Sequence, residues 1–244
     1  MISVCIATYN GEKHIKEQID SILCQLGEND EIIISDDGST DSSIEIIKGF
    51  NDKRIILLQH KSDVSFKKYP FRKVSKNFEN AINHATGDLI FLADQDDIWM
   101  ADKVPTVKKK MGNSLLLLHD CVVIDEQGIE LNSSYFDLNR SKQGIINNLI
   151  NCSFLGCCIV IRKELLKKAL PLPKNSVPHD LWFGLISTWM KKTIVIDNKL
   201  LLYRRHKNNF SSSGKKSEAS IAYKIRYRIL IIFSLAKRMM SRNF

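Results

Sequence analysis

Glycine and proline are scarce in this sequence, with 11 and 5 among its 244 residues. Such scarcity argues against long flexible or low-complexity stretches, and we find no internal repeat. Hydrophobic residues make up 44% of the chain and charged residues 26%, as is ordinary for a protein that buries a real core. The length therefore suits one α/β domain with a short appendage.

Long hydrophobic runs are also missing. The N-terminal MISVCIATYNG has no basic segment ahead of its apolar stretch, so we expect a strand there and not a signal peptide. Near the C-terminus the longest apolar run, Ile229 to Phe233, is far too short to span a bilayer.

The cysteines form no C-x-x-C pair, which is the usual sequence sign of a zinc or redox site. Four of the six lie in or beside apolar runs. This placement favours buried, reduced thiols over a metal site or a disulfide framework. The six are Cys5, Cys24, Cys121, Cys152, Cys157 and Cys158.

Acidic residues almost disappear after residue 210. From Ser211 onward eight basic residues face Glu218 alone, so this segment carries +7 of the chain's net +9. Apolar residues fill the rest, which predicts a basic amphipathic helical tail at 211–244. Two interpretations remain open: the tail lies on an anionic membrane surface, or its apolar face packs on the domain. Nucleic-acid binding is disfavoured because no recognition motif accompanies the charge.

Strand-like and helix-like segments alternate through the first hundred residues. We expect strands at 2–8, 31–35, 54–60 and 88–93, and helices at 12–26, 42–50 and 77–85. The polar, basic and aromatic stretch 61–73 predicts a loop. Such alternation is typical of βαβ units, and so of a mainly parallel sheet covered on both faces.

The second half is less regular. One or two strands are expected at 115–125, another at 156–162, and a strand pair at 193–206. Helices are expected at 163–169, before the prolines, and at 178–190. This half reads as an acceptor or lid region appended to a nucleotide-binding half.

Polar and acidic residues follow three of the predicted strands. They are Thr8-Tyr9-Asn10, Asp36-Asp37 and Asp94-Gln95-Asp96-Asp97. Ligands of open α/β sheets bind beyond the carboxyl ends of the strands, and crowded carboxylates there need a neutralising partner such as Mg²⁺ or Mn²⁺. On an extended segment Asp94 and Asp96 face the same way and Asp97 faces elsewhere. The competing interpretation is an exposed acidic turn that caps a helix.

Five segments together resemble the family 2 glycosyltransferases. They are SVCIATYNGEKHI, EIIISDDGSTD, NFENAINHATGDLIFLADQDDIW, PHDLWF and YRRHKNN, in the family's order over about residues 2–210. The resemblance implies a GT-A fold, with a mainly parallel, Rossmann-like sheet flanked by helices. The last segments and DQDDIW look most like the rhamnosyltransferase-like branch, whose members often build bacterial surface polysaccharides.

The resemblance also implies an inverting transfer of a sugar from a UDP- or dTDP-sugar to a saccharide or lipid-linked saccharide, assisted by Mg²⁺ or Mn²⁺. Residues 1–210 would form the catalytic domain, with 1–100 as its nucleotide-binding half and 101–210 as its acceptor-side half. The enzyme would be cytoplasmic and, under the membrane interpretation of the tail, peripheral on the inner face of the cytoplasmic membrane.

Residue roles come from the matched motifs. The segment that includes Ala7, Thr8 and Tyr9 would contact the nucleobase, with Glu12 beside it and Asp37 binding the base. Tyr9 equally suits an aromatic side chain that packs at a turn. Asp36 would be a turn residue.

On the phosphate side, the resemblance implies that Asp94 binds ribose or shares the metal. Asp96 would hold the metal that bridges the phosphates, and His206 is a candidate further ligand. Arg204 and Arg205 are candidates to neutralise the diphosphate, or else ordinary surface charge.

The transfer also needs a base, because the acceptor hydroxyl must lose a proton as it attacks the anomeric carbon. Asp180 matches the family's acceptor-side acid. Its position after Pro178 equally suits a carboxylate that stabilises a helix N-terminus, so both interpretations stay open.

Two other functions are weighed against transfer. A sugar-phosphate nucleotidyltransferase usually has a Gly-rich, basic loop after its first strand, and ATYNGEKHI offers one glycine and no arginine. A non-catalytic nucleotide-binding subunit of a polysaccharide assembly complex would be expected to have lost some of Asp37, Asp94, Asp96 and Asp180, which are all present.

Overall fold

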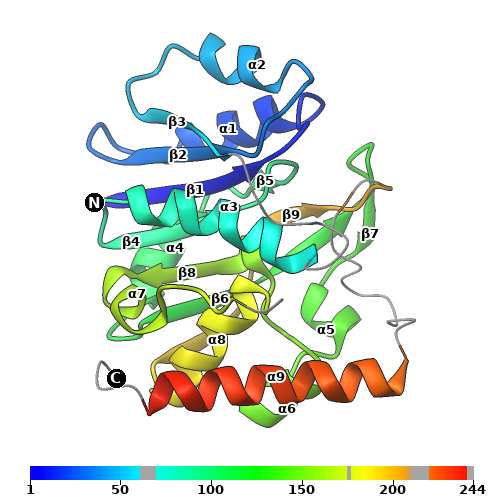
Figure 1. The fold of residues 1–244 in the computed structure, drawn as a ribbon. Coiled ribbons are helices and arrows are strands. Elements are labelled where there is room, and N and C mark those ends of the chain that lie inside the picture. The colour runs from blue at the N-terminus through cyan, green and yellow to red at the C-terminus, as the bar shows by residue number, and fades with distance from the viewer. Residues whose placement is uncertain (61–69, 175–176, 208, 210–219, 241–244) are drawn as a thin grey trace.

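A computed structural model describes residues 1–60, 70–174, 177–207, 209 and 220–240. Its centre is one mixed sheet in the order β3-β2-β1-β4-β8-β6-β9-β5, with β7 paired to β6. Helices lie on both faces of the sheet (Figure 1). The α/β prediction is therefore confirmed.

The first four strands are parallel neighbours. They are β1 (Ile2–Thr8), β2 (Glu31–Asp36), β3 (Ile55–Gln59) and β4 (Leu89–Ala93). The register pairs Thr8 with Asp36 and Ile6 with Ala93, so these strands end along one edge. Their continuous apolar runs fit strands that are buried on both faces.

Strands of the second half extend the same sheet. They are β5 (Ile98–Trp99), β6 (Leu116–Ile124), β7 (Glu130–Asn132), β8 (Ile159–Arg162) and β9 (Thr193–Arg204). β8 is antiparallel to both β4 and β6, so β6 again runs parallel to β4. β9 runs parallel to β6, and its C-terminal end comes to the edge where β1 and β4 end.

Helices connect and cover these strands. They are α1 (Ile15–Leu23), α2 (Ser43–Gly49), α3 (Pro70–His84), α4 (Lys103–Lys110), α5 (Tyr135–Asn139), α6 (Ile145–Ile150), α7 (Lys163–Ala169), α8 (His179–Trp189) and α9 (Ile221–Met239). A short 3₁₀ turn, η1 (Gly156–Cys158), precedes β8. Figure 1 shows α3 across one face of the sheet and α9 along one end of the molecule.

Three predictions of local structure were wrong. The predicted loop 61–73 is helical from Pro70, where the fixed φ of proline suits the first turn of α3; residues 61–69 lie outside the described part. The expected strand pair at 193–206 is the single strand β9. The start of the expected strand 156–162 is the turn η1.

The described part of the tail is the helix α9, and it packs on the domain. Ile231 and Leu235 are buried in the common core. Arg228 donates to the carbonyls of Leu149 and Ile150 at 2.8 and 2.9 Å. Within the described residues no helix is both long and apolar enough to cross a membrane. All six cysteines are free, and Cys24 alone among them is exposed.

Candidate active site

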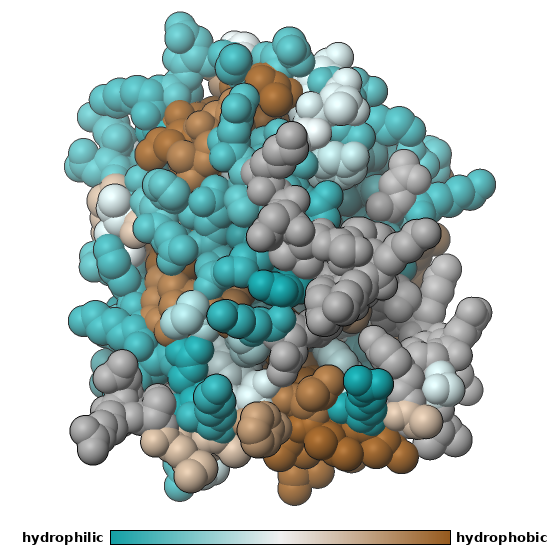
Figure 2. All heavy atoms as spheres, viewed as in Figure 1, coloured by the Kyte–Doolittle hydropathy of each residue, from teal (hydrophilic) through white to brown (hydrophobic). Residues whose placement is uncertain are grey.

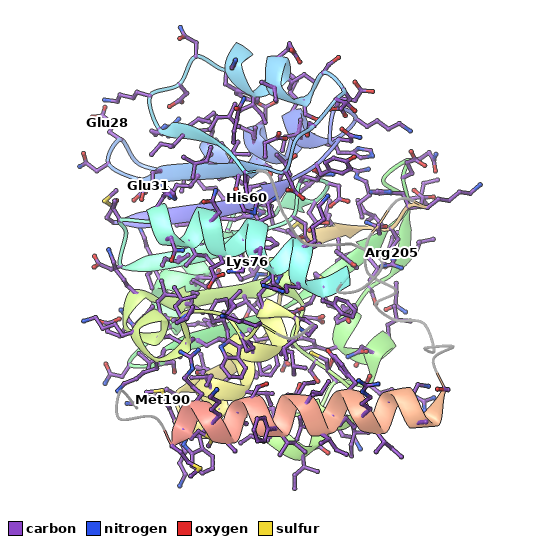
Figure 3. The ribbon with its side chains drawn as sticks, viewed as in Figure 1. Glu28, Glu31, His60, Lys76, Met190 and Arg205 are labelled. Carbon is purple, nitrogen blue, oxygen red and sulfur yellow. The ribbon has the colours of Figure 1, made fainter. Side chains whose placement is uncertain are left out.

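The predicted site residues gather at the edge where β1, β2, β4 and β9 end. Figure 3 orients this edge: Arg205 marks it after β9, and Glu31, at the start of β2, lies toward the opposite edge. Because parallel strands end together, residues 87 positions apart become neighbours. Thr8 Oγ1, for example, donates to Gln95 Oε1 at 2.7 Å.

Gln95 links the ends of β1 and β4. Its Oε1 also accepts from the Tyr9 amide at 2.9 Å, and its Nε2 donates to the Tyr9 carbonyl at 3.2 Å. Ala7 and Thr8 form the end of β1 beneath this link, and the ring of Tyr9 stays half exposed. The segment predicted to meet the nucleobase is therefore held open toward solvent by a side chain of the DQDD motif.

The two acids after β2 differ in their surroundings. Asp36 accepts from the amides of Gly38 and Ser39 at 3.0 and 2.9 Å, which fits the predicted turn role. Asp37 instead pairs with Lys73 of α3, with Oδ2 3.0 Å from Nζ.

Lys73 also lies over the Tyr9 ring, with Nζ 4.8 Å from the ring centroid. Asp37, Lys73 and Tyr9 thus form one compact group beside the end of β1.

Glu12 lies at the edge of this region. Its Oε2 accepts from the Ser42 amide at 3.0 Å, at the start of α2. An anionic side chain stabilises a helix N-terminus. The structure therefore gives Glu12 a contact with α2, next to the loop that carries Asp37.

The segment from Asp94 to Asp97 forms a turn directly after β4. The expectation that Asp94 and Asp96 face together while Asp97 faces elsewhere was wrong, because it assumed an extended chain. Carboxylate oxygens of Asp94 and Asp97 lie with the thiol of Cys157 within 4.8 Å of one another. Asp96 instead contacts the loop after β9.

Asp96 meets the predicted histidine. Its Oδ2 lies 2.8 Å from His206 Nε2 and accepts from Asn209 Nδ2 at 3.1 Å. The imidazole ring of His14 lies next to that of His206, with 5.6 Å between the ring centroids. Burial, followed by the charges of Arg204 and His206, lowers the pKa of His14.

Arg204 is buried and holds the site together. Its backbone amide donates to Asp97 Oδ1 at 2.9 Å and its Nε to the Asp96 carbonyl at 3.0 Å. The rest of its guanidinium donates to the Glu126 carbonyl and to Glu17. Arg204 therefore links the end of β9 to the acidic turn after β4 and to α1. Arg205 Nη1 donates to Tyr203 Oη at 3.0 Å. Neither arginine behaves as simple surface charge.

Asp180 lies in the first turn of α8, close to Asp94. Its Oδ1 accepts from the next amide, that of Leu181, at 2.6 Å. Burial raises the pKa of Asp180 to about 6. Burial, then the charges of Asp96 and Asp180, raises the pKa of Asp94 to about 7. A carboxylate with a pKa of about 6, such as Asp180, is a stronger base than an ordinary one and is still mostly ionised at neutral pH.

The structure also brings in residues that the sequence reading missed. Gln95, Lys73 and Asn209 all contact predicted site residues, as described above. Lys103 of α4 lies fully buried behind the acidic turn, with Nζ donating to the Cys157 carbonyl at 3.0 Å. Gln95 lies inside DQDD and Asn209 inside YRRHKNN, whereas Lys73 and Lys103 come from helices with no motif of their own.

The residues present fit a divalent cation. Two adjacent ligands of an octahedral ion lie about 3 Å apart when each is about 2.1 Å from the metal, and Asp96 Oδ2 and His206 Nε2 are 2.8 Å apart. Carboxylate oxygen and imidazole nitrogen suit Mn²⁺, and carboxylates with phosphate suit Mg²⁺.

The group Asp94, Asp97 and Cys157 fits less well. Burial raises the pKa of the Cys157 thiol well above its usual range, so that thiol stays protonated, whereas metals bind the thiolate.

A hollow of about 710 Å³ opens elsewhere, between the α5–α6 segment and the start of β9. Phe136, Lys142, Asn148 and Thr193 are among its lining residues. None of the predicted donor or catalytic residues lines this cavity. The candidate active site therefore lies at the strand ends and outside the cavity.

Comparison with known proteins identifies the family. The model described as Glycosyl transferase family 2 matches residues 3–170. The chain belongs to glycosyltransferase family 2. Its match contains the ends of β1, β2 and β4, and so most of the predicted donor residues. The resemblance seen in the motifs is confirmed, and the protein is a glycosyltransferase.

Two curated relatives match most of the chain. The dTDP-rhamnosyl transferase RfbG of Shigella flexneri is 29% identical over 92% of this chain and 78% of that protein. The Escherichia coli protein UDP-Glc:alpha-D-GlcNAc-diphosphoundecaprenol beta-1,3-glucosyltransferase WfaP is 26% identical over 97% of this chain and 92% of that protein.

Solved structures show the same fold. Staphylococcus aureus TarS 1-349 in complex with UDP-GlcNAc matches with a TM-score of 0.69 and 19% identity, over 95% of this chain and 66% of that one. Mannosyltransferase PcManGT from Pyrobaculum calidifontis in complex with GDP-Man and Mn2+ matches with a TM-score of 0.63 and 17% identity, over 86% and 58%. This chain spans about 60% of the length of these structures. Their similarity to it confirms the GT-A fold.

Proposed function

We propose that the protein is an inverting, metal-assisted glycosyltransferase of bacterial surface polysaccharide synthesis. It moves a sugar from a UDP- or dTDP-sugar to a saccharide or lipid-linked saccharide. The observation that carries this proposal is the contact of Asp96 with His206 at 2.8 Å, beside Asp94, whose pKa the charge of Asp180 in the first turn of α8 helps to raise.

On the donor side, the nucleobase lies between the Tyr9 segment and the Asp37–Lys73 pair. Asp37 accepts a hydrogen bond from the base, and Lys73 holds that carboxylate in place. Ala7 and Thr8, at the end of β1, lie beneath the base, and Glu12 holds the start of α2 beside it.

On the phosphate side, Asp96 and His206 would hold the cation, and Asp94 would contact the ribose or share in holding the cation. When bound, Mg²⁺ or Mn²⁺ stabilises the charge that develops on the departing diphosphate. Asn209 and Arg204 keep Asp96 in position through its side chain and its carbonyl.

On the acceptor side, Asp180 is the base. It removes the proton of the acceptor hydroxyl while that oxygen bonds to the anomeric carbon. The bond from this carbon to the diphosphate breaks on the opposite face, so the configuration inverts. One carboxylate suffices because the leaving group needs no proton.

Two relatives support the acceptor and donor classes. One is named as a dTDP-rhamnosyl transferase and the other as a glucosyltransferase acting on a diphosphoundecaprenol-linked sugar. A donor made in the cytoplasm and a lipid-linked acceptor would place the enzyme at the inner membrane face.

A nucleotide-release screen tests the proposal. Purified protein is incubated with single nucleotide sugars, Mn²⁺ or Mg²⁺, and saccharide acceptors, with a chelator as control. We expect release of a nucleoside diphosphate with one donor class, abolished by the chelator. Metal-independent turnover would remove the role given to Asp96, and pyrophosphate release from a triphosphate would indicate a nucleotidyltransferase.

A further inference from the structure

The helix α9 has two apolar faces, and the domain covers only one of them. Ile231, 1% exposed, packs inward with Leu235. On the opposite side Ile225, Ile229 and Phe233 follow one another at four-residue spacing, and Phe233 is 67% exposed. A helix that packs on a domain with one face has no structural need for a second apolar face.

The short helix α6 widens the exposed face. Ile146 and Ile150 are 74% and 64% exposed. Because Arg228 donates to the carbonyls of Leu149 and Ile150, α6 and α9 are held against each other. Figure 2 shows a large hydrophobic area at the end of the molecule where Figure 1 places α9 and α6. We call these two helices' exposed apolar residues the α6–α9 face.

The charged residues within α6 and α9 are all basic. Arg226 and Lys237, both exposed, flank the apolar stripe of α9 on the same side. Neither α9 nor α6 contains an acidic residue. A second copy of the chain would fit poorly, because antiparallel pairing of two such stripes brings Arg226 toward Lys237 of the other copy. Anionic lipid headgroups above an apolar layer match both features.

We propose that the α6–α9 face docks the enzyme on an anionic bilayer surface. Its isoleucines and phenylalanine enter the boundary between headgroups and acyl chains, while Arg226 and Lys237 meet the lipid phosphates. This docking does not depend on which sugar is transferred.

Docking would also fix the distance between the active site and the membrane surface. The guanidinium carbon of Arg238 lies 5.5 Å from the Trp182 ring centroid, and Trp182 follows Asp180 by two residues in α8. Arg238 also donates to the Leu170 carbonyl at 2.6 Å. Since α9 is thus fixed to α8, a docked α9 holds Asp180 at a constant distance from the membrane, which suits the lipid-linked acceptor of the proposed function.

Vesicle sedimentation tests the docking. The full chain is mixed with phosphatidylcholine vesicles with or without 30% phosphatidylglycerol, a probe composition of about one third anionic lipid. We expect cosedimentation with the anionic vesicles only. Ile229→Asp with Phe233→Asp should weaken it by about 100-fold, and Ile146→Asp with Ile150→Asp by about tenfold, since each removes two apolar groups from the interface. Ile129→Asp is the matched control, because Ile129 is 65% exposed on the β6–β7 turn.

Three results would overturn the proposal. They are no binding to anionic vesicles, equal binding by the α6 variant and wild type, or a wild-type dimer in solution that Phe233→Asp converts to a monomer. Nucleotide release with a soluble acceptor, measured in parallel, shows that each variant is folded. It also separates a failure of docking from a failure of the proposed transfer.

Discussion

The carboxylates of the site fall into two groups with opposite surroundings. Asp37 and Asp96 each face a basic side chain, Lys73 at 3.0 Å and His206 at 2.8 Å. Asp94 and Asp180 have no cation at that distance in the described structure, and burial raises the pKa of both. The pairs of Asp37 and Asp96 are thus already formed without substrate, whereas the charges of Asp94 and Asp180 are not balanced by a cation in such close contact.

The largest effect is expected at Asp180. Asp180→Asn removes the base and should lower transfer by about 10³-fold, since general base catalysis contributes that order. Donor affinity should stay unchanged, because Asp180 lies on the acceptor side. Asp137→Asn is a matched control: Asp137 is an exposed acid in the first turn of α5. If the two variants lose the same small amount of activity, Asp180 only stabilises its helix.

Asp96→Asn tests the paired group. It removes the charge that His206 and the cation share, and should lower transfer by roughly 10²-fold. Titration of donor binding with Mn²⁺ should lose its metal dependence in this variant. Asp197→Asn, at an exposed position of β9, should change neither measurement. Metal-dependent donor binding that survives Asp96→Asn would move the cation to other ligands.

A smaller effect is expected at Asp37. Asp37→Asn weakens the hydrogen bond to the nucleobase and the contact with Lys73, so KM for the donor should rise about tenfold with little change in kcat. The control is Asp20→Asn, which breaks an exposed pair with Lys16 at 2.8 Å. A lower kcat at unchanged KM would contradict a purely nucleotide-binding role.

The smallest effect is expected on stability, and it is a gain: a substitution at Asp94 should stabilise the protein. The pKa of Asp94 is about 7 in the folded protein against an ordinary value near 3.8, so its ionisation opposes folding progressively between about pH 4 and 7. Without metal, Asp94→Asn should therefore raise Tm by roughly 2–6 °C at pH 8. At pH 4 the Tm values of Asp94→Asn and wild type should be nearly equal. A lower Tm of Asp94→Asn at pH 8 would show that the ionised Asp94 does not destabilise the fold.

The strand ends could be predicted because apolar runs and the acids that follow them are local signals. The strands that precede Tyr9, Asp37 and Asp94 end along one edge of the sheet as expected, since the carboxyl ends of parallel neighbours lie together. The orientation of the acidic turn could not be predicted. It depends on Arg204 and Asn209, more than a hundred residues away, which hold Asp96 and Asp97 in a turn.

The two interpretations of the tail were posed as alternatives by the sequence, because periodicity shows that a helix is amphipathic but not what covers each side. The structure shows that α9 packs on the domain through Ile231 and Leu235. Its second apolar face becomes visible only once the first is covered, and α6 carried no sequence signal that linked it to the tail.

The pH dependence of transfer tests the central claim most directly. With saturating metal and donor, kcat/KM of the wild type for the acceptor should fall as pH drops through about 6, the pKa of Asp180, because the protonated carboxyl cannot accept the acceptor's proton. The residual activity of Asp180→Asn should lack this acid limb. A limb near pH 6 that persists in Asp180→Asn would show that another group is the base.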